Sequence, residues 1–136
     1  MKKIKMKKSV SGIILISLLM LLMSCSGEIS SSIINPPSWA IGTWTDSTDT
    51  VSYTFTSDDM IMNMSTAGMS VDMKEAIAAE AGAKAKENIS GDSYKVTISA
   101  ENESGTYTFV KTSDTTLNYT ISTSGVTFGP TELVKQ

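Results

Sequence analysis

The chain has 136 residues, with 11 basic and 14 acidic side chains, no histidine and one cysteine. All basic residues are lysines, and five of them fall at positions 2–8, so the rest of the chain is strongly acidic. Such a chain is repelled by phosphate backbones, which excludes nucleic-acid binding. Without histidine or arginine, the usual acid–base and nucleophilic partners of enzymes are missing, and the composition predicts no catalytic residues.

An export signal is predicted at the amino terminus. The lysines at positions 2–8 are followed by an apolar run from Val10 to Met23. This run has the length of a signal-peptide core and falls short of the ~18–20 residues that a spanning helix needs. It ends at Leu22-Met23-Ser24-Cys25, which contains the only cysteine of the chain.

These four residues resemble the lipobox of bacterial lipoproteins, where a branched apolar residue, a tolerant position and a small residue precede cysteine. The resemblance implies that residues 1–24 are a signal peptide cut between Ser24 and Cys25, and that the Cys25 thiol carries a diacylglyceryl group. The new amine would often be acylated as well, for example with palmitate. Ser26 favours the outer membrane of an organism that has one. An ordinary cleaved signal with an incidental cysteine, or an uncleaved anchor, is the alternative.

Cleavage after Ser24 would change both the length and the net charge of the protein. It leaves 112 residues and six lysines against 14 acids, a net charge of −8, which is enough chain for one small domain. Residues 25–37 are predicted to be the lipidated cysteine and a flexible tether, because they are rich in serine and end in Pro36-Pro37. Membrane attachment is therefore expected from the lipid on Cys25, and not from a polybasic patch.

The first strand of the remaining domain, residues 38–136, carries Gly42-Thr43-Trp44. At the start of a β meander this motif resembles the Gly-x-Trp motif of lipocalins and their relatives. The resemblance implies that Trp44 packs across the closed base of a barrel and that Gly42 lets the strand bend there. The arginine that commonly caps this tryptophan is absent from the chain, and no ligand-binding residue can be carried over.

Alternating apolar and polar residues predict further strands after residue 50. The inward-facing apolar residues are Val51, Tyr53, Phe55, Met60, Met62, Met64, Tyr94, Val96, Ile98, Ala100, Tyr107, Phe109, Leu117, Tyr119, Ile121, Val126 and Phe128. Short polar loops separate these segments, so the fold class is mainly β, an up-and-down antiparallel meander of about 7–8 strands. Closure into a small lipocalin-like barrel would hide the edges, and an open sheet covered by a helix is the alternative.

One helix is predicted near residues 72–88, inserted between strands. Alanine, glutamate and lysine dominate this segment, Asp72 and Glu75 fit a capping box, and Gly91 would stop the helix. Its apolar stripe is narrow and made largely of alanine. We therefore expect it to lie on the sheet or across a barrel mouth.

Two residue clusters could suggest metal chemistry. Met60, Met62, Met64, Met69 and Met73 carry soft thioethers suited to Cu(I), but alternate residues on one strand stand roughly 6.6 Å apart, so core packing or pocket lining is the preferred interpretation. The pairs Asp58-Asp59 and Glu101, Glu103 are interpreted as solvated loop charge. No metal and no cofactor is predicted.

The sequence thus predicts a non-enzymatic bacterial lipoprotein held at the membrane through Cys25. Its barrel would bind a small apolar ligand. The pocket would be lined by Tyr53, Phe55, Met60, Met62, Met64, Tyr94 and Tyr107. The alternative is a protein–protein interaction module of the cell envelope with a fully packed barrel and no ligand.

Overall fold

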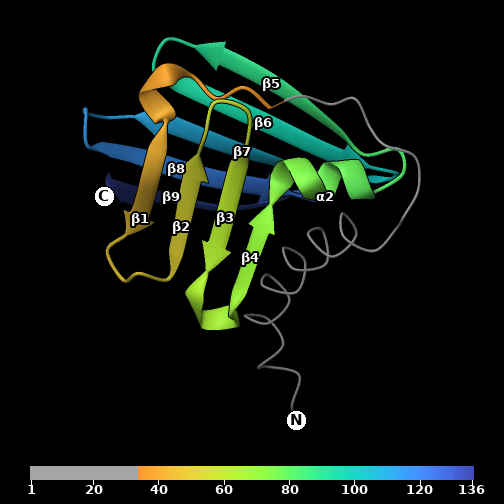
Figure 1. Ribbon diagram of the computed structural model, residues 1–136, viewed down its shortest axis with the longest axis horizontal. Helices are drawn as coiled ribbons and strands as arrows, with labels where there is room; N and C mark the ends of the chain where they lie inside the picture. Colours follow the sequence, from red (N-terminus) through yellow and green to blue (C-terminus); the bar gives the residue numbers. More distant parts are fainter. Residues whose placement is uncertain (1–33) are drawn as a thin grey trace.

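A computed structural model describes residues 34–136, and these residues form a mainly β domain with one inserted α-helix (Figure 1). The strands are β1 (Gly42–Asp46), β2 (Val51–Phe55), β3 (Met60–Met64), β4 (Met69–Asp72), β5 (Lys84–Ser90), β6 (Ser93–Ala100), β7 (Glu103–Lys111), β8 (Thr116–Thr123) and β9 (Val126–Lys135). The helix α2 (Met73–Ala79) lies between β4 and β5, and short 3-10 turns, η2 (Ser38–Ala40) and η3 (Ser65–Ala67), precede β1 and β4. The predicted mainly β fold is confirmed.

The strands form one antiparallel sheet with the order β4-β3-β2-β1-β9-β8-β7-β6-β5. Strands that follow one another along the chain are neighbours in the sheet, as in the predicted meander, except that β4 and β5 lie at opposite edges. The first strand pairs with the last, with Trp44 opposite Lys135. The sheet curls into a half-barrel (Figure 1). The meander is interrupted where the chain leaves β4, forms α2 and continues as β5 at the opposite edge of the sheet.

The structure has more strands than the predicted 7–8, and the two additional ones are the edges. β4 is four residues long and buries only Val71. In β5, Ala85 and Glu87 are half-buried and the other five residues are exposed. Edge strands have a neighbour on one side alone, so their apolar alternation is weak.

The helix predicted near residues 72–88 is correct in its first half and wrong in its second. Asp72 caps α2 as expected, accepting a hydrogen bond from the Glu75 backbone N–H at 3.0 Å. The helix ends at Ala79, the chain turns at Gly82 with φ +78°, and residues 84–90 then pair with β6. A backbone at φ +78° favours glycine. Ladder pairing along the free edge of β6 outweighs the good intrinsic helix propensity of the alanines and lysines, which is worth only tenths of a kcal/mol per residue.

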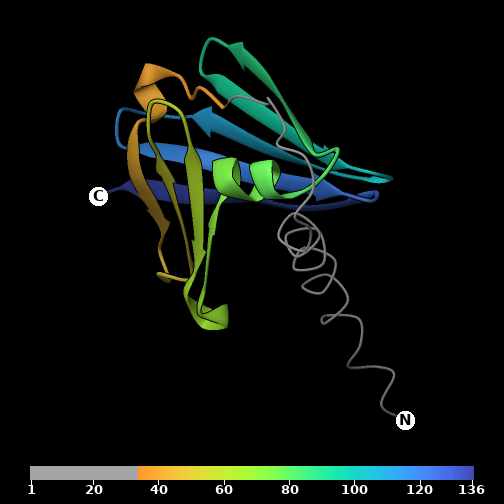
Figure 2. The same ribbon diagram turned by 45° about the vertical axis from the view of Figure 1, so that its right-hand side comes forward.

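The core lies on the concave side of the half-barrel. Its largest fully buried side chains are Trp44, Tyr53, Tyr94, Tyr107, Phe55, Phe109, Ile34, Met60 and Met62. Figure 2 shows α2 lying in the concavity between the two arms of the curled sheet, where it buries Met73, Ala76 and Ile77. Within residues 34–136, no helix has the length and apolar character to cross a bilayer.

A β-bulge in the last hairpin contributes to the curl of the sheet. The pairing of β8 with β9 shifts register between Tyr119 and Ile121. Opposite this shift lies Gly129 at φ +101°, where an added Cβ would come within 2.6 Å of the Tyr119 carbonyl oxygen. Bulges increase local twist and bend, and this one needs glycine.

The chain enters the domain along strand β5. Ile34 is 1% exposed, and the Asn35 backbone N–H donates to both carboxylate oxygens of Glu87, at 2.9 and 2.8 Å. Glu87 also accepts a hydrogen bond from the Tyr94 hydroxyl. The last residues of the segment predicted to be tether, Ile34–Pro37, therefore pack against the sheet, and Pro36 is buried as well.

Candidate functional site

Trp44 in β1 is fully buried, and two neighbours fix its ring. Its indole N–H donates to the Ala40 carbonyl oxygen at 2.7 Å, so the η2 turn satisfies the one polar atom of the side chain. On β9, Lys135 places its ammonium nitrogen 5.2 Å from the ring centroid. A cation at this distance is attracted by the electron-rich face of the indole.

Gly42 makes the approach of Lys135 feasible. Its φ is +127°, and an added Cβ would lie 2.9 Å from Cε of Lys135. Any other residue would be strained there and would displace the lysine stem. Sequence reasoning singled out Gly42 and Trp44 and missed Lys135, whose position in the last strand was its only signal.

The side chains expected to line a ligand pocket are packed against one another. Tyr53, Phe55, Met60, Met62, Tyr94 and Tyr107 are all at most 1% exposed, and Met64 is partly buried. Phe109 stands edge-on to Tyr53 and Phe55, with ring centroids 5.0 and 4.9 Å away. Such edge-to-face contacts give the interior a fixed aromatic arrangement.

Two hydroxyl groups in this interior have no hydrogen-bond partner among the described residues. They belong to Tyr53 and Tyr107, which are both 0% exposed. Burial raises the pKa of both phenols well above the usual range, and the nearby Tyr107 and Tyr119 hydroxyls add to the shift at Tyr53. Burying a hydroxyl without a partner costs about 1–3 kcal/mol, so these atoms are the polar points at which a bound molecule or water would be held.

Two depressions lie on the surface of the described domain. One of about 430 Å³ sits at the open side of the half-barrel, and Ser70, Val71, Asp72, Glu75, Ala76 and Ala79 line it. The other, of about 280 Å³, lies near the β1–β2 and β3–β4 connections and is lined mainly by polar side chains. The first one combines an apolar floor with the free edge of β4, where the sheet fails to close.

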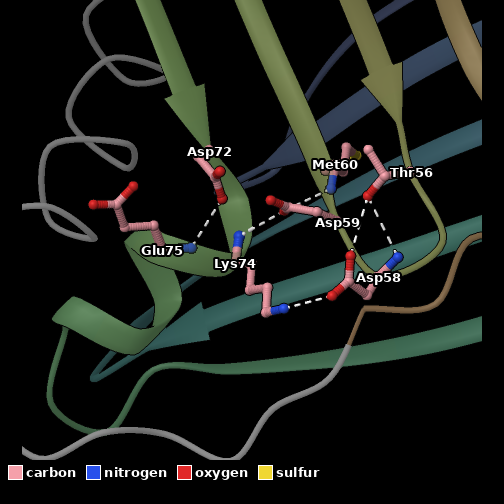
Figure 3. A network of polar contacts seen from close by, with 7 residues as sticks. All are labelled: Thr56, Asp58, Asp59, Met60, Asp72, Lys74 and Glu75. Atoms are coloured by element: carbon pink, nitrogen blue, oxygen red, sulfur yellow. Dashed lines mark hydrogen bonds and ion pairs between the residues drawn. The ribbon is translucent and has the colours of Figure 1, made fainter.

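An acidic pair joins β3 to the start of α2 (Figure 3). Asp59 is 8% exposed and accepts hydrogen bonds from the backbone N–H groups of Met60 (2.7 Å) and Lys74 (2.9 Å). Burial, and then hydrogen bonding with the Asp72 carboxyl, raises the pKa of Asp59 to about 6. Asp58 forms an exposed ion pair with the Lys74 ammonium at 2.6 Å. The prediction of solvated loop charge is correct for Asp58 and wrong for Asp59, which is part of the packing of α2.

The methionines divide between core and rim. Met60, Met62 and Met73 are at most 1% exposed, whereas Met64 and Met69 face each other across β3 and β4 and are partly buried. Three of the five thioethers therefore pack in the apolar interior, which agrees with the preferred interpretation. Among residues 34–136, no group of three or more His, Cys, Asp or Glu side chains is arranged to hold a metal ion.

The remaining predicted residues lie in turns or outside the described part. Glu101 lies in the β6–β7 turn, and Glu103 is the first residue of β7; both side chains are exposed, as expected of solvated charge. Ser24 and Cys25, the predicted cleavage and lipid-attachment residues, lie outside the described residues. Comparison with protein-family models, with curated proteins and with solved structures found no match.

Proposed function

We propose that the chain is a non-enzymatic lipoprotein of the bacterial cell envelope, anchored by lipid on Cys25, whose half-barrel binds a small, largely apolar ligand. The observation that carries the ligand proposal is the pair of buried, unpartnered hydroxyls of Tyr53 and Tyr107 inside an aromatic interior. The sheet does not close between β4 and β5, and we propose that the ligand enters there, past α2. The anchor is proposed on the Leu22-Met23-Ser24-Cys25 motif, with the outer membrane as destination in a diderm organism.

The surroundings of Trp44 support a lipocalin-like interpretation of the half-barrel. Gly42 and Trp44 start the first strand, and a cation from the last strand lies over the indole. In lipocalins an arginine commonly occupies that position. Lys135 would serve the same purpose here, in a chain that has no arginine.

The chemistry of the interior restricts the ligand. Tyrosine hydroxyls donate and accept hydrogen bonds, so they suit a carbonyl, ether or hydroxyl group. Among residues 34–136 the buried polar or charged side chains are Asp59, Glu80 and Thr123, and no lysine is among them. A buried carboxylate or phosphate without a cationic partner would be very costly. We therefore propose an uncharged apolar molecule with one polar group.

Gentle extraction of the lipidated protein followed by native mass spectrometry tests this proposal. We expect a co-purifying neutral compound, and its occupancy should fall about tenfold in Tyr53→Phe/Tyr107→Phe, which removes only the two hydroxyls. Tyr94→Phe is the matched control, because the Tyr94 hydroxyl already has a partner in Glu87. The ligand proposal fails if no compound accompanies the wild-type protein.

A second candidate is the packed interaction module of the envelope. The observation that favours it is the dense ring packing, with five aromatic side chains in contact through centroid distances of 4.9 to 6.4 Å. In this case buried waters would satisfy Tyr53 and Tyr107, and the protein would emerge from extraction without a bound compound.

A further inference from the structure

Three lysines share the outer face of β5 and β6. Lys84 and Lys86 alternate along β5, and the antiparallel register places Lys86 opposite Thr97 and Asn88 opposite Lys95. Cross-strand partners share a face of the sheet, so all three lysines lie on the convex side, with Lys86 roughly 7–8 Å from each of the other two positions. All three side chains are exposed. We call this surface the β5–β6 lysine face.

The β5–β6 lysine face carries positive charge on a protein that is acidic overall. Its other positions, Ser90, Asn88, Ser93, Thr97 and Ser99, are neutral. The ion pairs seen among residues 34–136 are Lys74–Asp58 and Lys111–Asp114, so the three lysines belong to neither. Half of the six lysines after residue 24 are gathered here, and no acidic residue among residues 34–136 occupies a position of this face. Glu87 of β5 lies on the opposite face, and Asp92 lies in the β5–β6 turn. Residues 25–136 therefore have a basic face although their net charge is −8.

The chain joins the domain on the same strand. Asn35 is bonded to Glu87 of β5, and Ile34 is buried beside it. Eight residues, 26–33, separate Ile34 from Cys25 in the sequence. A chain of this length cannot span more than about 32 Å even when fully extended. The strand that carries the lysines is therefore held near any membrane to which Cys25 is attached.

We propose that the β5–β6 lysine face docks on the anionic headgroups of the membrane in which Cys25 is anchored. This proposal rests on the proposed lipid anchor. Each lysine near an anionic leaflet increases surface association about fivefold, and the attraction decays within a Debye length of about 10 Å. The connection to Cys25, which spans at most about 32 Å, allows the face to come within that distance of the headgroups. The acidic remainder of the domain is repelled, so the domain is oriented with β5 and β6 toward the bilayer.

Lysine footprinting on the full lipidated protein tests the orientation. The protein is reconstituted in phosphatidylcholine vesicles with or without phosphatidylglycerol, acetylated briefly, and digested for mass spectrometry. We expect the reactivity of Lys84, Lys86 and Lys95 to fall at least about threefold in the anionic vesicles. Lys74, in an exposed ion pair, and Lys111, a partly buried side chain paired with Asp114, are internal controls. The protection should disappear near 1 M salt, where the Debye length is about 3 Å.

Amide hydrogen exchange of residues 84–90 gives an independent reading. Anionic vesicles should slow exchange in the wild type and in Lys74→Gln/Lys111→Gln, but not in Lys84→Gln/Lys86→Gln/Lys95→Gln. The proposal is overturned if Lys84, Lys86 and Lys95 are each acetylated equally fast in both vesicle types. Protection that is as strong in pure phosphatidylcholine also overturns it, because it indicates contact between copies of the chain.

The same digest separates this proposal from the anchor. The mass of the peptide that begins at Cys25 reports directly whether lipid is attached. A lipidated peptide without lysine protection refutes the docking face alone. An unlipidated peptide refutes the anchor and, with it, the docking proposal.

Discussion

Lys135 stabilises the Trp44 site with two parts of one side chain. Its ammonium lies over the indole ring, and its methylene stem passes Gly42, where there is no Cβ to obstruct it. The contact connects the first strand to the last, because Trp44 is opposite Lys135 in the ladder. A single residue therefore reinforces the seam at which β1 meets β9.

Replacing Lys135 should lower stability through the lost cation–π attraction. We expect Lys135→Gln to reduce the free energy of unfolding by about 0.5–1 kcal/mol, measured by urea denaturation. Lys111→Gln is the control, since Lys111 pairs with Asp114, whose side chain is 95% exposed, and such pairs contribute little. If both substitutions lower the free energy of unfolding equally, the contact of Lys135 with Trp44 contributes no more to stability than the Lys111–Asp114 pair does.

At the scale of single residues, the sequence predicted Gly42 and Trp44 of the Trp44 site but not Lys135. Gly42 and Trp44 form a local motif, and the burial of Trp44 follows from alternation within β1. Lys135 could not be assigned, because its contact depends on which strand closes against β1 and in what register. Neither is encoded within a short window of residues.

Among the elements, the start of α2 is held by two carboxyl groups, of Asp59 and Asp72. Asp59, immediately before β3, accepts a hydrogen bond from the Lys74 backbone N–H at the first turn of the helix, and Asp72 caps the same turn. Two carboxylates so close cannot both ionise without repulsion. The attachment of α2 across the open side of the half-barrel is therefore tighter when Asp59 is protonated.

This pair predicts an unusual pH dependence of stability. The pKa of Asp59 is about 6 in the folded protein against an ordinary 3.8, so the folded state keeps a proton that the unfolded chain loses in this window. The free energy of unfolding should therefore fall as the pH rises from about 4 to about 6, by about 1–2 kcal/mol. Urea denaturation at a series of pH values measures it.

Asp59→Asn should remove that dependence, because an amide keeps the hydrogen bonds and cannot ionise. The variant should be more stable than the wild type at pH values above about 7. Asp114→Asn, at an exposed site, is the control and should leave the slope unchanged. A wild-type slope that persists in Asp59→Asn would contradict the role of Asp59.

The elements that sequence reasoning recovered are those with two neighbours in the sheet. Strong alternation identified residues 51–55, 60–64 and 93–100, where each strand lies between partners. Residues 84–90 have good helix propensity and become a strand only because the free edge of β6 is available. Intrinsic preference is overridden by a tertiary partner whose position no local pattern reveals.

For the molecule as a whole, the uneven distribution of charge matters more than its sum. The net charge of −8 on residues 25–136 predicts repulsion from anionic membranes, but the β5–β6 lysine face lies on the strand where the chain enters the domain. The composition could not reveal this, because it depends on the register of two strands. The proposed anchor supplies attachment, and the lysines supply orientation.

The anchor itself makes a prediction for the intact protein. Cells supplied with labelled palmitate should incorporate the label into the wild type, and Cys25→Ala should abolish it, because no other cysteine is available. The wild type, with two or three acyl groups, should also remain stably bound to membranes. Cys25→Ala carries no acyl group, so lipid should not hold it there. Label that persists in Cys25→Ala would refute the anchor.

The pairing of β1 with β9 sets the order in which the domain can be completed. Residue 44 meets residue 135, so this seam spans nearly the whole described chain. Contacts between such distant segments form late and slowly, because a long loop must close before they contribute. During synthesis or transport the two arms of the half-barrel can therefore form separately, as hairpins, while the seam stays open. The domain acquires its full cooperativity only when its last strand has arrived.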